Sequence, residues 1–93
     1  MNFVDKYLKA LTEAHNKEYD RLYPNLEYPE FTAKYGKKYI KILRTRGQEM
    51  VHCFLDFDGN IYKAASWKAP AKGIRGNVNN EKYPLMGGEY YKS

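Results

Sequence analysis

Apolar side chains recur at spacings of three and four residues through the first 22 residues of the chain. This spacing places them on one face of an α-helix, with charged residues on the other face. Asn2 or Asp5 can cap the start of such a helix, and Pro24 would end it. The pattern therefore predicts an amphipathic helix over residues 3–22 whose apolar face packs on a sheet. The apolar positions are Phe3, Val4, Tyr7, Leu8, Leu11, Ala14, Tyr19 and Leu22.

From residue 31 the pattern changes to the alternation that is typical of β-strands. Strands are predicted over 31–35, 38–46, 49–57 and 61–65. Gly36-Lys37, Arg46-Gly47-Gln48 and Asp58-Gly59-Asn60 separate these segments, and such residues favour tight turns. The sequence therefore predicts an α+β fold, in which the N-terminal helix packs on an antiparallel meander of three or four strands.

The length of 93 residues predicts a single domain over 1–93. Its parts would be a helix (1–22), an antiparallel sheet (31–66), a basic loop with Trp and Gly (67–78) and an irregular tail (79–93). The tail could wrap a sheet edge through Tyr83, Leu85 and Met86, or remain loose. A single Cys excludes an internal disulfide, and no apolar run is long enough for a membrane span.

Basic residues are concentrated in the second part of the sequence. Residues 1–30 carry six acidic and four basic side chains, whereas residues 31–93 carry five acidic and twelve basic ones. A basic half favours nucleic acid, a nucleotide or another acidic partner, although it could also reflect a Lys-rich composition. Lys41 and Arg44 lie in the basic predicted strand and are secondary candidates for an anion-binding site.

The richest chemistry lies in residues 62–78, which contain the only Trp of the chain and four cationic side chains. A loop of Gly, Lys, Arg and Asn beside an aromatic ring can offer charge and backbone N–H groups to an anion. Trp67 could stack on a base, and Arg75 could clamp a phosphate. Alternatively, Trp67 and Pro70 cap the core while the cations remain solvated. The anion-binding candidates are Lys63, Ser66, Trp67, Lys68, Lys72, Arg75 and Asn77.

Other chemistry receives less support from the spacing of the residues. Asp56-Phe57-Asp58-Gly59-Asn60 has Gly at the wrong position for an EF-hand calcium loop, so a hairpin turn is favoured. His52 and Cys53 are neighbours on a strand and are expected on opposite faces, which argues against a metal site. His52 remains a secondary candidate for acid–base or phosphate chemistry, with a half-buried sheet histidine as the alternative. We predict no catalytic residues, metal or cofactor, and the sequence favours a protein without enzymatic activity.

The run Tyr62-Lys-Ala-Ala-Ser-Trp-Lys-Ala-Pro-Ala-Lys-Gly-Ile-Arg-Gly-Asn77 resembles a signature of small uncharacterised proteins from tailed bacteriophages and large DNA viruses. Residues 36–42 and 51–56 resemble the two preceding strands of that family, so the resemblance covers about 36–78. It omits the N-terminal helix, and the tail is similar only loosely, through residues 86–90. The resemblance implies a viral source and a location in the host cytoplasm. It implies no activity and no catalytic residues, because the family has no assigned activity.

Together these features predict an uncharacterised viral accessory protein that binds nucleic acid or a nucleotide through its basic loop. The alternative is a protein-interaction module without catalytic activity, such as an inhibitor of a host factor or a virion-associated protein. A hydrolase or nuclease that uses His52 is a third hypothesis. No membrane association is expected, and a homodimer could form if an open sheet edge pairs across a two-fold axis.

Overall fold

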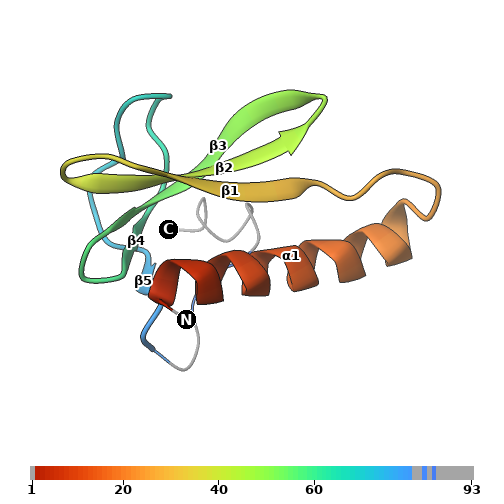
Figure 1. Cartoon of the computed structure of the whole chain (residues 1–93), viewed down its shortest axis with the longest axis horizontal. Helices are drawn as coiled ribbons and strands as arrows, with labels where there is room; N and C mark the ends of the chain where they lie inside the picture. Colours follow the sequence, from red (N-terminus) through yellow and green to blue (C-terminus); the bar gives the residue numbers. More distant parts are fainter. Residues whose placement is uncertain (1, 81–82, 84, 86–93) are drawn as a thin grey trace.

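The computed structural model of the chain describes residues 2–80, 83 and 85. One long helix lies across one face of a five-stranded antiparallel sheet, which confirms the predicted α+β fold (Figure 1). We call the sheet face that packs on the helix the helix face and the opposite one the outer face. The elements are α1 (Phe3–Leu22), β1 (Glu30–Tyr35), β2 (Tyr39–Arg46), β3 (Gln48–Asp56), β4 (Asn60–Tyr62) and β5 (Gly76–Asn77).

Helix α1 has the predicted bounds because its ends carry the expected signals. The side chain of Asn2 caps the first turn, where its Oδ1 accepts a hydrogen bond from the backbone N–H of Asp5 at 2.9 Å. At the other end, the backbone N–H of Tyr23 donates to the carbonyl oxygen of Tyr19, and Pro24 follows. The buried residues of the helix form a single stripe: Val4, Tyr7, Leu11, His15 and Tyr19.

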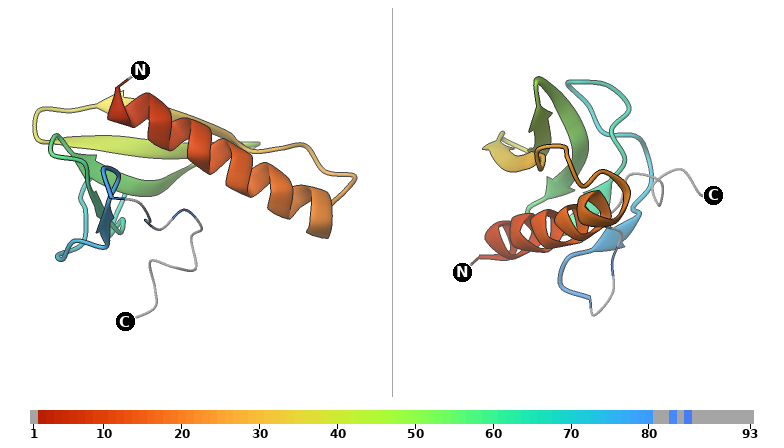
Figure 2. Two further views of the ribbon diagram at one scale, coloured as in Figure 1. Left: turned by 90° about the horizontal axis from the view of Figure 1, so that it is seen from below. Right: turned by 90° about the vertical axis from the view of Figure 1, so that its right-hand side faces the viewer.

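The strands follow one another in the order β1-β2-β3-β4-β5, so β2 is an interior strand with a neighbour on each side. Short turns join the first four strands, and two of these turns contain a glycine with positive φ, Gly47 (79°) and Gly59 (87°). Figure 2 shows that α1 crosses beneath the sheet at a shallow angle. The arrangement buries one face of β2 and β3 and leaves β1 and β5 as the two edges.

The predicted strands match the structure to within one residue except in two places. The fourth strand ends at Tyr62 instead of Ala65, and the residues after it leave the sheet. The segment predicted as a loop over 67–78 contains a fifth strand, β5, whose Asn77 and Gly76 pair with Asn60 and Ile61. A strand of two residues is too short to give any periodic pattern, so its position depends on pairing with the exposed edge of β4.

A β-bulge in β3 overturns the expected alternation of side chains. Ile42 pairs with Cys53 but the next residue of β2, Leu43, pairs with Val51, so His52 has no partner opposite it. As a result, His52 and Cys53 both point to the helix face instead of opposite faces. The His52 ring contacts the ring of His15 on α1, and the Cys53 thiol is 3.3 Å from the Tyr7 hydroxyl.

The main core fills the space between α1 and the helix face. Its apolar members come from the helix, from the first four strands and from the residue after β5. Tyr83 and Leu85 pack against this core, and the rings of Tyr83 and Tyr7 have centroids 5.7 Å apart. Tyr83 and Leu85, two of the tail residues predicted to pack if the tail is ordered, thus contact the core, while Met86 lies outside the described residues. The buried core residues are Val4, Tyr7, Leu11, Phe31, Ile40, Ile42, Cys53, Leu55, Ile61 and Val78.

Candidate anion-binding face

The outer face carries a row of side chains that crosses four strands. The pairing register places Lys34 of β1 opposite Lys41 of β2, Lys41 opposite Phe54 of β3, and Phe54 opposite Tyr62 of β4. Directly paired residues of antiparallel strands point to the same face, so two ammonium groups and two aromatic rings follow one another across the sheet. Lys34 is exposed, whereas Phe54 retains only 3% of its accessible surface.

A folded loop over residues 63–71 lies above this row (Figure 1, turquoise). Its base is closed by the backbone N–H of Ala71, which donates to the carbonyl oxygen of Lys63 at 2.7 Å, and Ala64 pairs with Pro70. The loop brings the indole of Trp67 to Lys41, whose ammonium nitrogen lies 4.4 Å from the ring centroid. This is cation–π geometry. The indole is still 45% exposed, so it forms part of the surface and is not sealed in the core.

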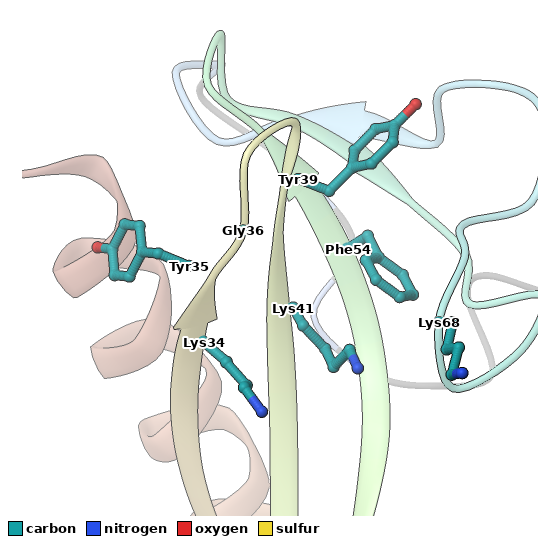
Figure 3. A pocket seen from close by; sticks show the side chains of 7 residues that line it. All are labelled: Lys34, Tyr35, Gly36, Tyr39, Lys41, Phe54 and Lys68. Carbon is teal, nitrogen blue, oxygen red and sulfur yellow. The ribbon is translucent and has the colours of Figure 1, made fainter.

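Three lysines from three segments converge beside this loop. Lys34, Lys41 and Lys68 line a pocket of about 240 Å³ together with Tyr39 and Phe54. We call this the basic pocket. Figure 3 shows Lys41 and Lys68 on either side of the Phe54 ring and Lys34 beyond Lys41, while Tyr35 points away toward the helix side. No carboxylate is among the described residues that line the pocket. Because like charges that lie close together repel one another, a bound anion would stabilise this arrangement.

Several predicted binding residues have structural roles in the loop and its surroundings. The Ser66 hydroxyl oxygen accepts hydrogen bonds from the backbone N–H groups of Lys68 and Ala69, at 3.3 and 3.2 Å, which stabilises the turn around Trp67. The Asn77 side-chain amide donates to Oδ1 of Asn60 at 2.8 Å. These contacts explain the need for Ser and Asn at these positions without a ligand.

The remaining cations of the predicted loop are not part of the basic pocket. Lys63, Lys72 and Arg75 do not appear among the described residues that line it, and Lys72 and Arg75 are exposed. The backbone N–H of Arg75 donates to the carbonyl oxygen of Ile61, which fixes the entry into β5. The structure therefore divides the predicted loop site: Trp67 and Lys68 join Lys41, and the other cations lie elsewhere.

Arg44 is separated from Lys41 by the thickness of the sheet. Three positions apart on one strand, the two side chains point to opposite faces. The Arg44 guanidinium donates from Nη2 to the Tyr19 hydroxyl at 2.7 Å, on the helix face. Its Nε is buried and has no hydrogen-bond partner among the described residues. Grouping Arg44 with Lys41 in one site was therefore wrong.

His52 also lies on the helix face, where its ring contacts that of His15. The Nε2 atoms of His15 and His52 lie 3.2 and 3.1 Å from the same carbonyl oxygen, that of Leu85. The two rings also contact Phe31. Burial, and after it the charge of the neighbouring His15, lower the pKa of His52 to about 4. Both rings are thus positioned to donate as neutral imidazoles to Leu85, which argues for a structural role of His52.

Asp56 organises the β3–β4 hairpin, whose sequence was compared above with a calcium-binding loop. Its Oδ1 accepts from the backbone N–H groups of Asp58 and Asn60, and its Oδ2 accepts from the Asn60 amide and the Tyr62 hydroxyl, all within 2.9 Å. Burial raises the pKa of Asp56, but these hydrogen bonds outweigh burial, so the pKa lies below its usual value. The donation to Asp56 raises the pKa of Tyr62 to about 12.

The sequence-based prediction missed five of the seven residues that line the basic pocket: Lys34, Tyr35, Gly36, Tyr39 and Phe54. Their signal was present in the predicted hairpin between the strands over 31–35 and 38–46. Once the turn at Gly36 is accepted, the register places Lys34 opposite Lys41. Tyr39 lies two residues before Lys41 on the same strand, so alternation places it on the same face. Its ring contacts those of Phe54 and Tyr62 there.

These features define a small α+β protein with a basic, partly aromatic pocket on the exposed face of its sheet. Over residues 1–86 the chain matches the family of unknown function DUF7717, and it belongs to that family. Comparisons with curated proteins and with solved structures give no match. Within the described part of the chain, no helix combines the length and apolar character that crossing a membrane requires.

Proposed function

We propose that this protein binds nucleic acid or a nucleotide on the outer face of its sheet. In this proposal Lys34, Lys41 and Lys68 contact phosphate groups, and Trp67 stacks on a base. The convergence of these three lysines, from β1, β2 and the loop over 63–71, is the observation that carries the proposal. Positive charge beside an exposed aromatic ring is the combination that single-stranded nucleic acids require.

The size and shape of the basic pocket favour a nucleic-acid strand over a free small molecule. Its volume of about 240 Å³ is below the range of roughly 300–1,000 Å³ that is typical of sites that enclose a ligand. A strand needs no enclosure, because each nucleotide contributes one phosphate and one base to an extended surface. Lys41 covers part of the indole, so a base would stack on the part of the Trp67 ring that remains exposed.

The biological setting of the proposal comes from the sequence resemblance. The segment 62–77 is similar to a signature of small bacteriophage and large DNA virus proteins. We infer that the chain is a viral accessory protein that acts in the host cytoplasm. Trp67 and Lys68 belong both to that segment and to the outer face, which links the resemblance to the binding surface.

Fluorescence anisotropy with labelled single-stranded DNA and RNA, measured over a series of salt concentrations, tests the proposal. The triple variant Lys34→Gln, Lys41→Gln, Lys68→Gln should bind more weakly. If each lysine meets one phosphate, the slope of log K against log salt should decrease in magnitude by about 2, because each lost contact contributes about 0.7 for a single strand. The Trp67→Ala variant should bind about 5- to 150-fold more weakly, as expected for the loss of one stacked base.

A matched variant separates a defined site from general attraction by net charge. Lys6, Lys9 and Lys17 are exposed on α1, and replacing all three with Gln changes the net charge by the same amount. This variant should keep nearly the wild-type salt slope. The proposal fails if wild type binds neither polynucleotides nor nucleotides at low salt, or if the two triple variants lose the same affinity.

The alternative function, a protein-interaction module, is favoured by a different surface. Four large apolar side chains at the end of α1 and in the segment after it are 44–50% exposed: Leu22, Tyr23, Leu26 and Tyr28. Exposed apolar clusters of this kind are typical of protein contacts. In a pull-down from nuclease-treated host lysate, a specific host protein that is retained by wild type and lost with Leu22→Ser, Leu26→Ser would support this function.

A further inference from the structure

Strand β1 is the longer exposed edge of the sheet. It has six residues, whereas β5 at the other edge has two. Figure 2 (right) shows β1 on the side of the sheet away from β4 and β5. In the part of the chain that the structure describes, β2 is the only strand that pairs with it. An edge of this length offers unpaired N–H and C=O groups to another strand.

We propose that β1 pairs with β1 of a second copy of the chain, antiparallel, about a two-fold axis that passes through Thr32. Antiparallel partners that lie directly opposite each other point to the same face, so a symmetric pairing must match even-numbered with even-numbered residues and odd-numbered with odd-numbered ones. In the register centred on Thr32, residue 30 of each copy lies opposite residue 34 of the other. This register also uses nearly the whole strand.

The side chains of β1 are complementary to themselves in this register. Glu30 of one copy lies opposite Lys34 of the other, and the two-fold axis generates this opposite-charge pair twice. Both side chains are exposed, and neither belongs to an ion pair within the described residues. On the helix face, the large Phe31 would lie opposite the small Ala33. A shift by two residues would place Thr32 opposite Glu30 or Lys34 and would remove both charge pairs.

The paired edges would join two five-stranded sheets into one, with both outer faces on the same side. Lys34 would then meet Glu30 of the second copy, while Lys41 and Lys68 of each copy would remain available to an anion. The dimer does not depend on nucleic-acid binding, since the charge pairs and the backbone edge suffice for it. Its failure would therefore leave the proposed binding function intact, and the reverse also holds.

Reciprocal charge reversal, followed by sedimentation equilibrium over a range of protein concentrations, tests this dimer. Glu30→Lys alone and Lys34→Glu alone each place like charges opposite each other, and each should raise the dimer Kd by at least about tenfold. The double variant Glu30→Lys, Lys34→Glu restores both opposite-charge pairs. A mixture of the two single variants also restores both pairs, so it should form a heterodimer with a Kd near that of wild type.

These variants also reveal whether a loss of association reflects misfolding, because a misfolded single variant could not be rescued by mixing. A second measurement uses the two-fold axis itself. Thr32→Cys should form a cross-linked dimer on oxidation, whereas Lys37→Cys in the exposed β1–β2 turn should not, and the native Cys53 is buried. The proposal is overturned if wild type stays monomeric at all concentrations, or if neither the double variant nor the mixture associates.

Discussion

The two histidines between the helix and the sheet should make the stability of the fold depend on pH. His15 and His52 share the carbonyl oxygen of Leu85, and burial lowers the pKa of each ring below 6.5. The Arg44 guanidinium lowers both pKa values further, and the carboxylate of Glu18 raises that of His15. Between the folded and the unfolded pKa, the unfolded chain binds more protons than the folded one. The two neutral histidines therefore contribute fully to the free energy of unfolding above about pH 6.5, and this contribution is lost as the pH falls toward about 4.

The size of the effect follows from the pKa of His52. With a pKa of 6.5 in the unfolded chain and about 4 in the folded one, linkage predicts that the free energy of unfolding decreases by about 2 kcal/mol between pH 7 and pH 5. His15 adds to this loss with the same sign. Asp56 contributes little in this range, because its carboxyl group has an ordinary pKa of 3.8 and a still lower one in the hairpin.

Urea unfolding at pH 7 and pH 5, followed by circular dichroism, measures this change for wild type and for His52→Gln. The Gln side chain retains an N–H donor for Leu85 but cannot be protonated in this range, so the variant should lose about 2 kcal/mol less than wild type between the two pH values. The reasoning is refuted if both proteins lose the same free energy, because His52 would then not be the group that titrates. His15→Gln is the matched variant; it should remove the contribution of His15 and also reduce that of His52, because the charge of His15 lowers the pKa of His52.

Two further substitutions test the hairpin and the core. Gly59→Ala should lower the free energy of unfolding by about 1–3 kcal/mol, because φ is +87° and the new Cβ would lie 2.8 Å from Nδ2 of Asn79. Gly73→Ala has a similar φ of +97° but no atom within 4 Å, so a loss as large as that of Gly59→Ala would contradict the predicted clash. Leu11→Ala should cost about 2–5 kcal/mol in urea unfolding, since Leu11 is fully buried. Leu22→Ala, on the exposed end of the same helix, should change stability by about 0.5 kcal/mol or less, and equal losses would refute the proposed packing of α1.

The helix and the first three strands could be predicted because each carries its own local pattern. Helix α1 has a stripe, a cap and a terminating proline within one segment, and its bounds were predicted correctly. The strands β1 to β3 alternate over six to nine residues and are separated by strong turn residues. In contrast, β5 has two residues, and no local pattern marks them. It exists because the chain returns to the edge of β4 after the loop over 63–71.

The bulge at His52 shows a second limit of local reasoning. Strict alternation assigns His52 and Cys53 to opposite faces. One unpaired residue in β3 reverses the assignment and brings His52 to His15, with ring centroids 5.4 Å apart. No residue type marks this position in the sequence, since a bulge of this kind depends on how β3 packs on its neighbours.

The basic pocket illustrates how much of a binding surface depends on pairing register. The composition of residues 62–78 drew attention to Trp67 and Lys68 on the outer face, but it grouped them with Lys72 and Arg75, which do not line the basic pocket. The ring of Trp67 instead contacts Lys41 of β2, because the loop folds back over the outer face. Lys34 could have been included by adding, to the charged residues of the loop, the residues that pair across the strands of the preceding hairpin. The same register places Lys34 on the exposed edge strand, so one side chain connects the proposed anion site with the proposed dimer. Measuring Lys34→Gln in both assays would therefore show whether the two surfaces compete for it.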